Sequence, residues 1–120
     1  MRSMIRYKSG DVVLIPFPFT DLTAVKQRPA VVLSSSRFNH KREDVIVAAI
    51  TSHVPQKLPV DEYRFSSREQ QLAGLPQSSL VKLGKIVTID QKLIRKRLGR
   101  ILPNTRKRLI VILVNIFQEP

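Results

Sequence analysis

The sequence contains no cysteine. A disulfide framework, a thiolate nucleophile and a cysteine-ligated zinc site are therefore excluded. Only two histidines are present, His40 and His53, and they do not have the helical spacing of a metal-binding pair. We accordingly expect neither a metal site nor a cofactor.

Long apolar runs are also missing. The longest, from Leu109 to Val114, is far shorter than the roughly 20 residues that a membrane-spanning helix needs. The segment from Met1 to Ser9 is basic, but no apolar stretch follows it, so no signal peptide is predicted. These features predict a cytoplasmic protein without a membrane span.

Acidic residues are scarce relative to basic ones. Nine Asp and Glu face 21 Lys and Arg, which leaves a net charge of +12 at pH 7. Such an excess attracts polyanions, and binding to a nucleic acid is further favoured by the release of its counterions. Charge favours a nucleic-acid partner over a merely soluble surface, but it does not separate RNA from DNA, or binding from cleavage.

The length and the apolar content suit one domain. The chain has 120 residues, of which 42% are hydrophobic, and it shows no internal repeat or low-complexity tract. We therefore expect a single domain spanning residues 1–120.

The apolar segments are short and rich in β-branched residues, as is typical of strands. Strands are predicted at 11–15, 29–34, 44–52, 60–65, 79–83 and 86–89, with a bend or bulge at Gly84. Pro16 and Pro18 are expected to end the first strand, which leaves residues 17–28 as a loop.

Helical signals are fewer. Asp90 is a suitable N-cap for a helix over 91–98 ending at Gly99, and Asn104 or Thr105 for a helix over 106–117. Shorter helical turns are expected within 34–42 and 66–75. Short connections between most strands favour a mainly β fold, namely an antiparallel, strongly bent sheet or small barrel with helices at its edge.

Several blocks of the sequence together resemble the MazF/PemK family of toxins. The blocks are GDVVLIPFPFTDL (10–22), KQRPAVVLS (26–34), VAAITS (47–52), GLPQSSLVKL (74–83) and KIVTID (85–90). They occur in the order found in the family and cover nearly the whole chain, which makes the match far more specific than any single block.

The resemblance implies a fold, an activity and partners. The fold is the small SH3-like barrel with short helices shared by MazF, PemK and CcdB toxins, usually as a homodimer. The activity is sequence-specific, metal-independent cleavage of single-stranded RNA, which leaves a cyclic phosphate and a free 5′-hydroxyl. The partner is an antitoxin that lays an extended acidic segment over the RNA groove. The family's functional residues correspond to Arg28 and Thr51.

The chemistry of RNA cleavage can be compared with these residues. Attack by the 2′-hydroxyl needs a base, stabilisation of charge on the phosphate, and an acid for the leaving oxygen. Arg28 suits phosphate binding because its planar fork matches phosphate oxygens, and the Thr51 hydroxyl can donate to the same group. Arginine stays protonated, so Asp21 and His53 are the two candidate bases.

Further residues near these positions are predicted to bind RNA. They are Phe17, Phe19, Thr20, Lys26, Gln27, Ser52, Gln77 and Ser78. Each candidate also has a purely structural explanation. Arg28 can be a solvated loop residue, Asp21 a turn cap, and His53 an exposed strand-end residue, while the two phenylalanines can belong to the core instead of stacking on unpaired bases.

The basic cluster near the C-terminus has three interpretations. It contains Arg95, Lys96, Arg97, Arg100, Arg106, Lys107 and Arg108. It can be a solvated helix face, a surface that guides RNA, or the surface that an acidic antitoxin segment neutralises. Two other functions also stay open for the whole chain: a non-enzymatic toxin that poisons gyrase on the same fold, and a simple nucleic-acid-binding barrel. Retention of Arg28 and Thr51 favours the ribonuclease.

Overall fold

The computed structural model describes residues 6–17 and 26–120. Within them, six strands form one antiparallel sheet in the order β4-β5-β3-β2-β1-β6. The strands are β1 (Asp11–Phe17), β2 (Lys26–Val32), β3 (Asp44–Thr51), β4 (Glu62–Arg64), β5 (Leu80–Asp90) and β6 (Lys96–Arg100). The helices are α1 (Ser36–Lys41), α2 (Ser67–Leu72), the 3-10 turn η1 (Gln91–Leu93) and α3 (Pro103–Phe117). The expected mainly β, antiparallel fold is confirmed.

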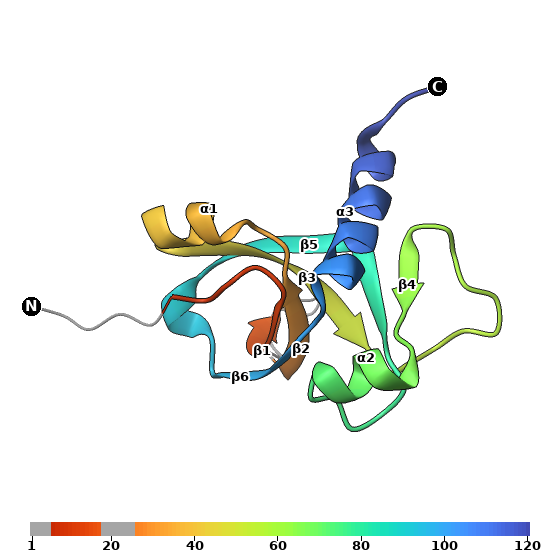
Figure 1. The fold of residues 1–120 in the computed structure, drawn as a ribbon, viewed down its shortest axis with the longest axis horizontal. Coiled ribbons are helices and arrows are strands. Elements are labelled where there is room, and N and C mark those ends of the chain that lie inside the picture. The colour runs from red at the N-terminus through yellow and green to blue at the C-terminus, as the bar shows by residue number, and fades with distance from the viewer. Residues whose placement is uncertain (1–5, 18–25) are drawn as a thin grey trace, which may run out of the picture.

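The sheet is strongly curled, and the helices lie around it (Figure 1). Helices α1 and α2 lie at opposite ends of the sheet, and α3 rises from its middle with its C-terminal end away from the other elements (Figure 1). Both short helices agree with the helical turns predicted within 34–42 and 66–75. The curled sheet thus forms a half-barrel, and the helices lie around it.

The central strands bury side chains on both faces. Val12, Val31 and Ala48 belong to one core cluster, together with Ala73 and Leu75 after α2 and Leu109 of α3. Their immediate neighbours in sequence belong to a second cluster: Val13, Val32 and Ala49. Alternate residues of a strand point to opposite faces. Strands covered on both faces therefore read as continuous apolar runs, as seen at 12–15 and 45–50.

The strand β1 passes through Pro16, contrary to the prediction that this proline ends it. Pro16 pairs with Gln27, and Phe17 with Lys26, so β2 also starts earlier than expected and includes Arg28. The pairing of β1 with β6 ends at Leu14. Beyond that residue β1 is an edge strand in the described part of the chain, which is where a residue without an N–H is tolerated.

The bend predicted at Gly84 is confirmed within a single long strand. In the pairing of β3 with β5, Ala48 lies opposite Ile86 whereas Ala49 lies opposite Lys82. Residues 83–85 therefore form a bulge, which bends β5 and increases the local twist. The two strands predicted at 79–83 and 86–89 are the two halves of β5.

The helix predicted over 91–98 is wrong. Asp90 does cap a turn, since its carboxylate accepts from Lys92 N at 2.8 Å, but only the 3-10 turn η1 follows. The buried Gln91 side chain fixes this turn by donating to the Asn39 carbonyl at 2.9 Å and accepting from Tyr7 N at 3.0 Å. The chain then pairs with β1 as β6, because hydrogen bonding to an open sheet edge outweighs local helix propensity.

The final helix is confirmed, but its predicted start and cap are wrong. The helix α3 begins at Pro103, and Leu102 is an N-cap without a side-chain hydrogen bond. Proline at the first helical position needs no N–H partner, so it starts the helix in place of Asn104 or Thr105. The Thr105 hydroxyl instead donates to Glu69 on α2.

Candidate functional site

The structure brings Arg28 and Thr51 together. Arg28 lies in β2 just before Pro29, and Thr51 is the last residue of β3. Ala30 of β2 pairs with Ala49 of β3, and continuing this antiparallel register by two residues places Arg28 opposite Thr51. Both residues line the same two hollows of the surface. Arg28 and Thr51 are far apart in the sequence, and the pairing of β2 with β3 brings them together.

The larger hollow is a cleft of about 390 Å³. One wall comes from the sheet and the other from the segment after α2. The lining residues are Leu14, Arg28, Pro29, Ile50, Thr51, Ser52, Gly74, Leu75, Pro76, Gln77, Ser79, Lys96 and Leu98. The mixture of an apolar floor with a few polar and cationic groups is typical of a ligand site.

The second hollow, of about 170 Å³, lies on the other side of the same pair. Lys82 and Lys85 from the bulged part of β5 line it, together with Arg28 and Thr51. The Lys82 ammonium lies 3.7 Å from the Glu62 carboxylate. No Asp or Glu of the described residues lines either hollow, so the pair lies in a cationic environment that favours an anionic ligand.

The Thr51 hydroxyl is held by the turn after β3. Its oxygen accepts from His53 N at 3.1 Å. A hydroxyl that accepts in this way still has its proton to donate. Thr51 is thus oriented by the backbone, and its O–H remains able to donate to a ligand in the cleft.

His53 lies beyond the strand. On a continuous strand Thr51 and His53 would share one face, but β3 ends at Thr51 and His53 is an exposed residue beyond the strand. Its side chain lines neither hollow. The other candidate base, Asp21, lies outside the described residues, as do Phe19 and Thr20.

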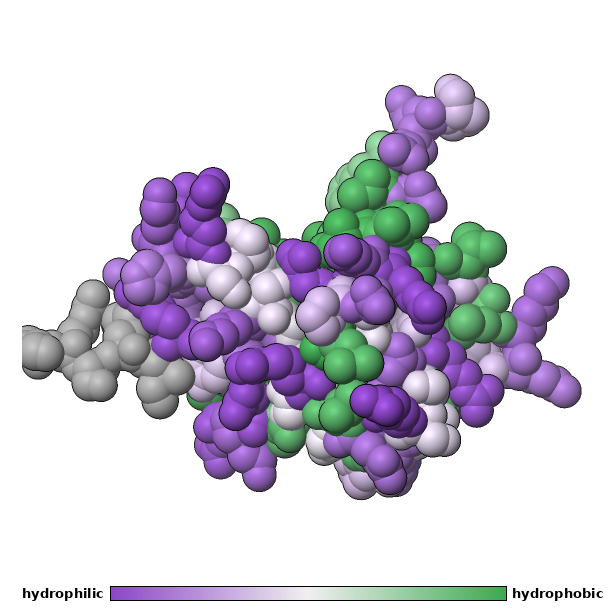
Figure 2. Space-filling view, in the orientation of Figure 1, coloured by the Kyte–Doolittle hydropathy of each residue, from purple (hydrophilic) through white to green (hydrophobic). Residues whose placement is uncertain are grey.

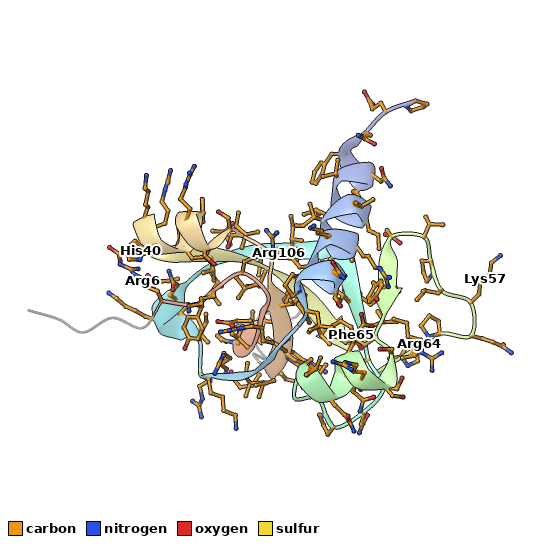
Figure 3. The ribbon with its side chains drawn as sticks, viewed as in Figure 1. Arg6, His40, Lys57, Arg64, Phe65 and Arg106 are labelled. Carbon is orange, nitrogen blue, oxygen red and sulfur yellow. The ribbon has the colours of Figure 1, made fainter. Side chains whose placement is uncertain are left out.

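The other predicted RNA-binding residues fall in different places. Ser52 and Gln77 line the cleft. Ser78 lies outside both linings, and its hydroxyl accepts from Arg64 Nη2 at 3.5 Å. Figure 3 shows Arg64 beside Phe65, next to α2. Lys26 and Gln27 are exposed at the start of β2.

Phe17 is a core residue. Its side chain is 5% exposed and belongs to the second core cluster. The prediction that it stacks on an RNA base is therefore wrong, because strand β1 continues past Pro16 and turns this ring inward. The core explanation that the sequence left open is correct for this ring.

Sequence reasoning missed several residues of the site. Lys82 and Lys85 flank the glycine of the bulge, and the predicted bend at Gly84 was the available signal for their convergence. Lys96 was noticed only as a member of the basic cluster, and its assignment to a helix hid its place beside Leu14. Leu75 and Pro76 carried no chemical signal.

The cleft wall formed by the segment after α2 is fixed by close backbone contacts with β6. Gly74 has φ +72°, and a Cβ there would lie 2.0 Å from the Leu98 carbonyl oxygen. A Cβ on Gly99 would lie 2.3 Å from the Leu72 carbonyl oxygen. Two glycines therefore allow the end of α2 to lie directly on β6, and this contact sets the width of the cleft.

A buried carboxylate anchors the other side of α2. Glu69 Oε2 accepts from the hydroxyls of Tyr63 and Thr105, each at 2.7 Å, and Oε1 accepts from Ser66 N at 2.8 Å. Burial raises the pKa of Glu69, but the hydrogen bonds from Ser66, Thr105 and Tyr63 together lower the pKa below its ordinary value. Ionised Glu69 therefore joins α2 to β4 and α3.

This network predicts an acid-dependent loss of stability. A lowered carboxyl pKa stabilises the fold above the unfolded-state pKa, and the stabilisation is lost as pH falls through the folded-state pKa. We expect Glu69→Gln to lower the free energy of unfolding at pH 7 by about 1–3 kcal/mol. The variant should also lose stability less steeply than wild type below the ordinary carboxyl pKa of 4.5. Urea denaturation at pH 7 and in acid measures both effects.

The control for this prediction is Glu43→Gln, which removes an exposed carboxylate. It is expected to leave the unfolding free energy unchanged within about 0.5 kcal/mol. Identical acid dependence of wild type and Glu69→Gln would contradict the role assigned to the Glu69 network.

The described residues offer neither a metal-binding cluster nor a membrane-spanning helix. Among residues 6–17 and 26–120, no group of three or more His, Asp or Glu side chains is placed to hold a metal ion. No helix in the same residues is long and apolar enough to cross a membrane.

Comparison with known proteins supplies the family context. A family model described as "PemK-like, MazF-like toxin of type II toxin-antitoxin system" matches residues 8–116. No curated protein matches the sequence.

Solved structures share the fold at low identity. One is an endoribonuclease from a mycobacterial species, with 18% identity, coverage of 99% of this chain and 98% of that chain, and a TM-score of 0.75. A mycobacterial endoribonuclease in complex with its cognate antitoxin has 16% identity, coverage of 95% and 97%, and a TM-score of 0.73. A MazE–MazF structure from Deinococcus radiodurans has 19% identity, coverage of 98% and 100%, and a TM-score of 0.72.

Proposed function

Because the chain belongs to the PemK-like, MazF-like toxins of type II toxin–antitoxin systems, we propose that it is a sequence-specific endoribonuclease acting on single-stranded RNA in the cytoplasm. One observation carries the proposal: Arg28 and Thr51 meet at the ends of β2 and β3, in a cleft lined by cations and by none of the described carboxylates. Such a site suits a phosphodiester.

The proposed reaction uses the RNA's own 2′-hydroxyl. The 2′ oxygen attacks the adjacent phosphorus, the bond from phosphorus to O5′ breaks, and a 2′,3′-cyclic phosphate and a 5′-hydroxyl are formed. The 2′ proton passes to a base, and O5′ takes up a proton as it leaves. No metal ion takes part in this reaction, in which protein donors stabilise the phosphate.

Arg28 and Thr51 stabilise the charge that develops on the phosphate. The guanidinium donates to the non-bridging oxygens, two N–H groups at a time. The Thr51 hydroxyl, whose oxygen already accepts from His53 N, donates to the same phosphate. Donors held in place before the reaction cost no reorganisation when the charge forms, which is why they lower the barrier.

The base is one of two residues. The described residues that line the hollows contain no carboxylate and no imidazole. Asp21 and His53 therefore remain the candidates. A pH–rate profile distinguishes them, because its rising limb reports the deprotonation of the base. Loss of that limb in Asp21→Asn or His53→Gln identifies the residue.

The activity is tested on a long single-stranded RNA with EDTA present. We expect discrete fragments whose 5′ ends share one short sequence, and no cleavage of a DNA strand of the same sequence. Intact RNA across a broad set of sequences would contradict the proposal. It would instead favour the gyrase-poisoning toxin or, if RNA is bound but not cut, the simple binding barrel.

We also propose an antitoxin partner and self-association. A mycobacterial endoribonuclease that shares this fold at 16% identity is solved in complex with its cognate antitoxin. For this chain, a net charge of +12 favours an acidic antitoxin segment. A homodimer is implied by the family resemblance, and α3 supplies apolar surface for it.

The exposed face of α3 predicts where a second copy binds. Val111, Val114 and Phe117 are spaced three residues apart on the helix, and Phe117 is 71% exposed. We expect Phe117→Asp to shift the protein from dimer to monomer in sedimentation velocity, because a charge cannot be buried there without a partner. Val60→Asp changes an exposed valine in the loop before β4 and serves as the control. A wild-type monomer, or a dimer unaffected by Phe117→Asp, would contradict this prediction.

A further inference from the structure

A third hollow lies on the surface beside β6. It has a volume of about 500 Å³ and lies between the segment before β1 and the strand β6. Six cationic side chains line it: Arg6, Lys8, Arg95, Lys96, Arg97 and Arg100. Figure 2 shows strongly hydrophilic side chains over the position of β6, at the lower left of the view. We call this surface the β6 hollow.

The charges of the β6 hollow are not balanced within the described residues. Asp11 is its one carboxylate, and that side chain is 2% exposed. Asp11 Oδ1 accepts from Arg100 Nε at 2.8 Å and lies 3.8 Å from Arg97 Nη1, and Oδ2 accepts from Lys8 N at 2.8 Å. A buried, fully engaged carboxylate offers nothing to a cationic ligand, so the hollow is suited to an anion.

A bulge in β6 gathers these cations. Val12 pairs with Gly99 whereas Val13 pairs with Arg97, so Leu98 is an extra residue in the strand. In a regular strand, residues three apart point to opposite faces. The extra residue places Arg97 and Arg100 on the same side, and both reach Asp11.

The β6 hollow and the cleft have one lining residue in common. Lys96 lines both of them. Leu98, the extra residue of the β6 bulge, also lines the cleft. An anionic chain that leaves the cleft therefore meets Lys96 first and Arg95 and Arg97 next.

The basic cluster seen in the sequence is divided by the structure. The residues of β6 line the hollow, whereas Arg106 and Arg108 of α3 are engaged elsewhere. Arg106, at the base of α3 in Figure 3, donates to the Leu33 carbonyl at 2.8 Å, and Arg108 donates to the Tyr63 hydroxyl at 3.4 Å. The part of the cluster positioned to bind a ligand beside the cleft is therefore the part on β6.

We propose that the β6 hollow is a second phosphate-binding subsite, which holds the flanking nucleotides of the RNA strand whose cleavage site occupies the cleft. This inference rests on the proposed function. A nucleic-acid strand carries one phosphate per nucleotide whatever its sequence, so it supplies anions to the cleft and to the hollow at once. Tyr7, which borders the hollow, offers an aromatic side chain on which a flanking base can stack.

The test compares binding of short and long RNA by a charge-neutralised variant. The double variant Arg95→Gln, Arg97→Gln removes two cations of the hollow and leaves the cleft lining intact. The probes are RNAs with a single 2′-deoxy nucleotide at the mapped cleavage site, either limited to that site or extended at the 5′ or the 3′ side. Fluorescence anisotropy over a range of salt concentrations gives their affinities.

We expect the double variant to differ from wild type on only one of the two extended RNAs, namely the one whose added nucleotides reach the β6 hollow. A plot of the logarithm of the binding constant against the logarithm of salt concentration has a negative slope. For the double variant this slope should be shallower by about 1.4, because each phosphate contact to a single strand contributes about 0.7 to its magnitude. The short deoxy-substituted RNA should be bound as by wild type, and a short all-ribose RNA of the same sequence should be cleaved as by wild type. The matched control, Arg37→Gln with Lys41→Gln, removes two exposed cations from α1 and should leave every slope unchanged.

Two results would overturn the inference. An unchanged slope on both extended RNAs would leave the cations with only the role of protecting the edge strand β6 from pairing with another sheet. Unchanged RNA binding with lost affinity for polyglutamate would assign the hollow to an acidic protein segment. Failure of the proposed function is distinguishable, because it appears as wild-type protein that does not cut the short all-ribose RNA.

Discussion

Replacing Arg28 with alanine is expected to lower kcat for RNA cleavage by about 10²–10³, the loss typical of one preorganised donor to a developing negative charge. Arg28 and Thr51 together line both hollows, on the neighbouring strands β2 and β3. Its guanidinium is the group with the geometry to hold two phosphate oxygens at once. Single-turnover cleavage of a short RNA measures the effect without contributions from product release.

The control for this variant is Arg37→Ala, which removes the same charge from an exposed position on α1. Its kcat should remain within about twofold of wild type, because screening weakens the effect of a distant surface charge. Arg28 is exposed, so Arg28→Ala should keep its unfolding free energy within about 1 kcal/mol of wild type. Equal losses in both variants would mean that net charge, and not the position of Arg28, supports the activity.

The second large effect is expected at Gly74. Alanine there would need a left-handed backbone conformation, and its Cβ would overlap the Leu98 carbonyl oxygen. Strain of this kind costs about 1–3 kcal/mol, and an added overlap in a packed contact costs a similar amount. We therefore expect Gly74→Ala to lose about 2–6 kcal/mol of unfolding free energy in urea denaturation. Moving the end of α2 away from β6 should also lower RNA cleavage.

Gly84→Ala is the matched control for the substitution at Gly74. A Cβ at Gly84 would meet only the Asp61 carboxylate, at an ordinary 3.4 Å. This variant should stay within about 1 kcal/mol of wild type, although Gly84 also lies in a strand bulge. A Gly74→Ala protein as stable as Gly84→Ala would contradict the close contact between α2 and β6.

The central strands were predictable because both of their faces are buried. Runs such as VVLI (12–15) are apolar throughout, and no other element type suits so short a run of β-branched residues. The strand β6 was not predictable in this way. Its residues follow a good cap at Asp90 and end in basic residues and a glycine, which is also the pattern of a short helix. Only the open edge of β1, a long-range feature, decides between the two.

The candidate site was predictable only in part. Arg28 and Thr51 were inferred from the family resemblance, since nothing in their spacing indicates that they meet. Their proximity depends on the register of β2 against β3, which is set by the packing of both faces. The place of Lys96 in the cleft also depends on strand pairing, because Lys96 reaches the cleft only when β6 pairs with β1.

One chemical measurement tests the central claim most directly: the identity of the new ends when purified protein cuts a defined RNA in EDTA. Two substrates are compared, one all-ribose and one with a single 2′-deoxy nucleotide on the 5′ side of the mapped bond. Attack by the 2′-hydroxyl in the cleft of Arg28 and Thr51 predicts a 2′,3′-cyclic phosphate and a 5′-hydroxyl from the first substrate, and no cleavage of the second. Cleavage of the deoxy-substituted strand, or ends carrying a 5′-phosphate, would contradict it.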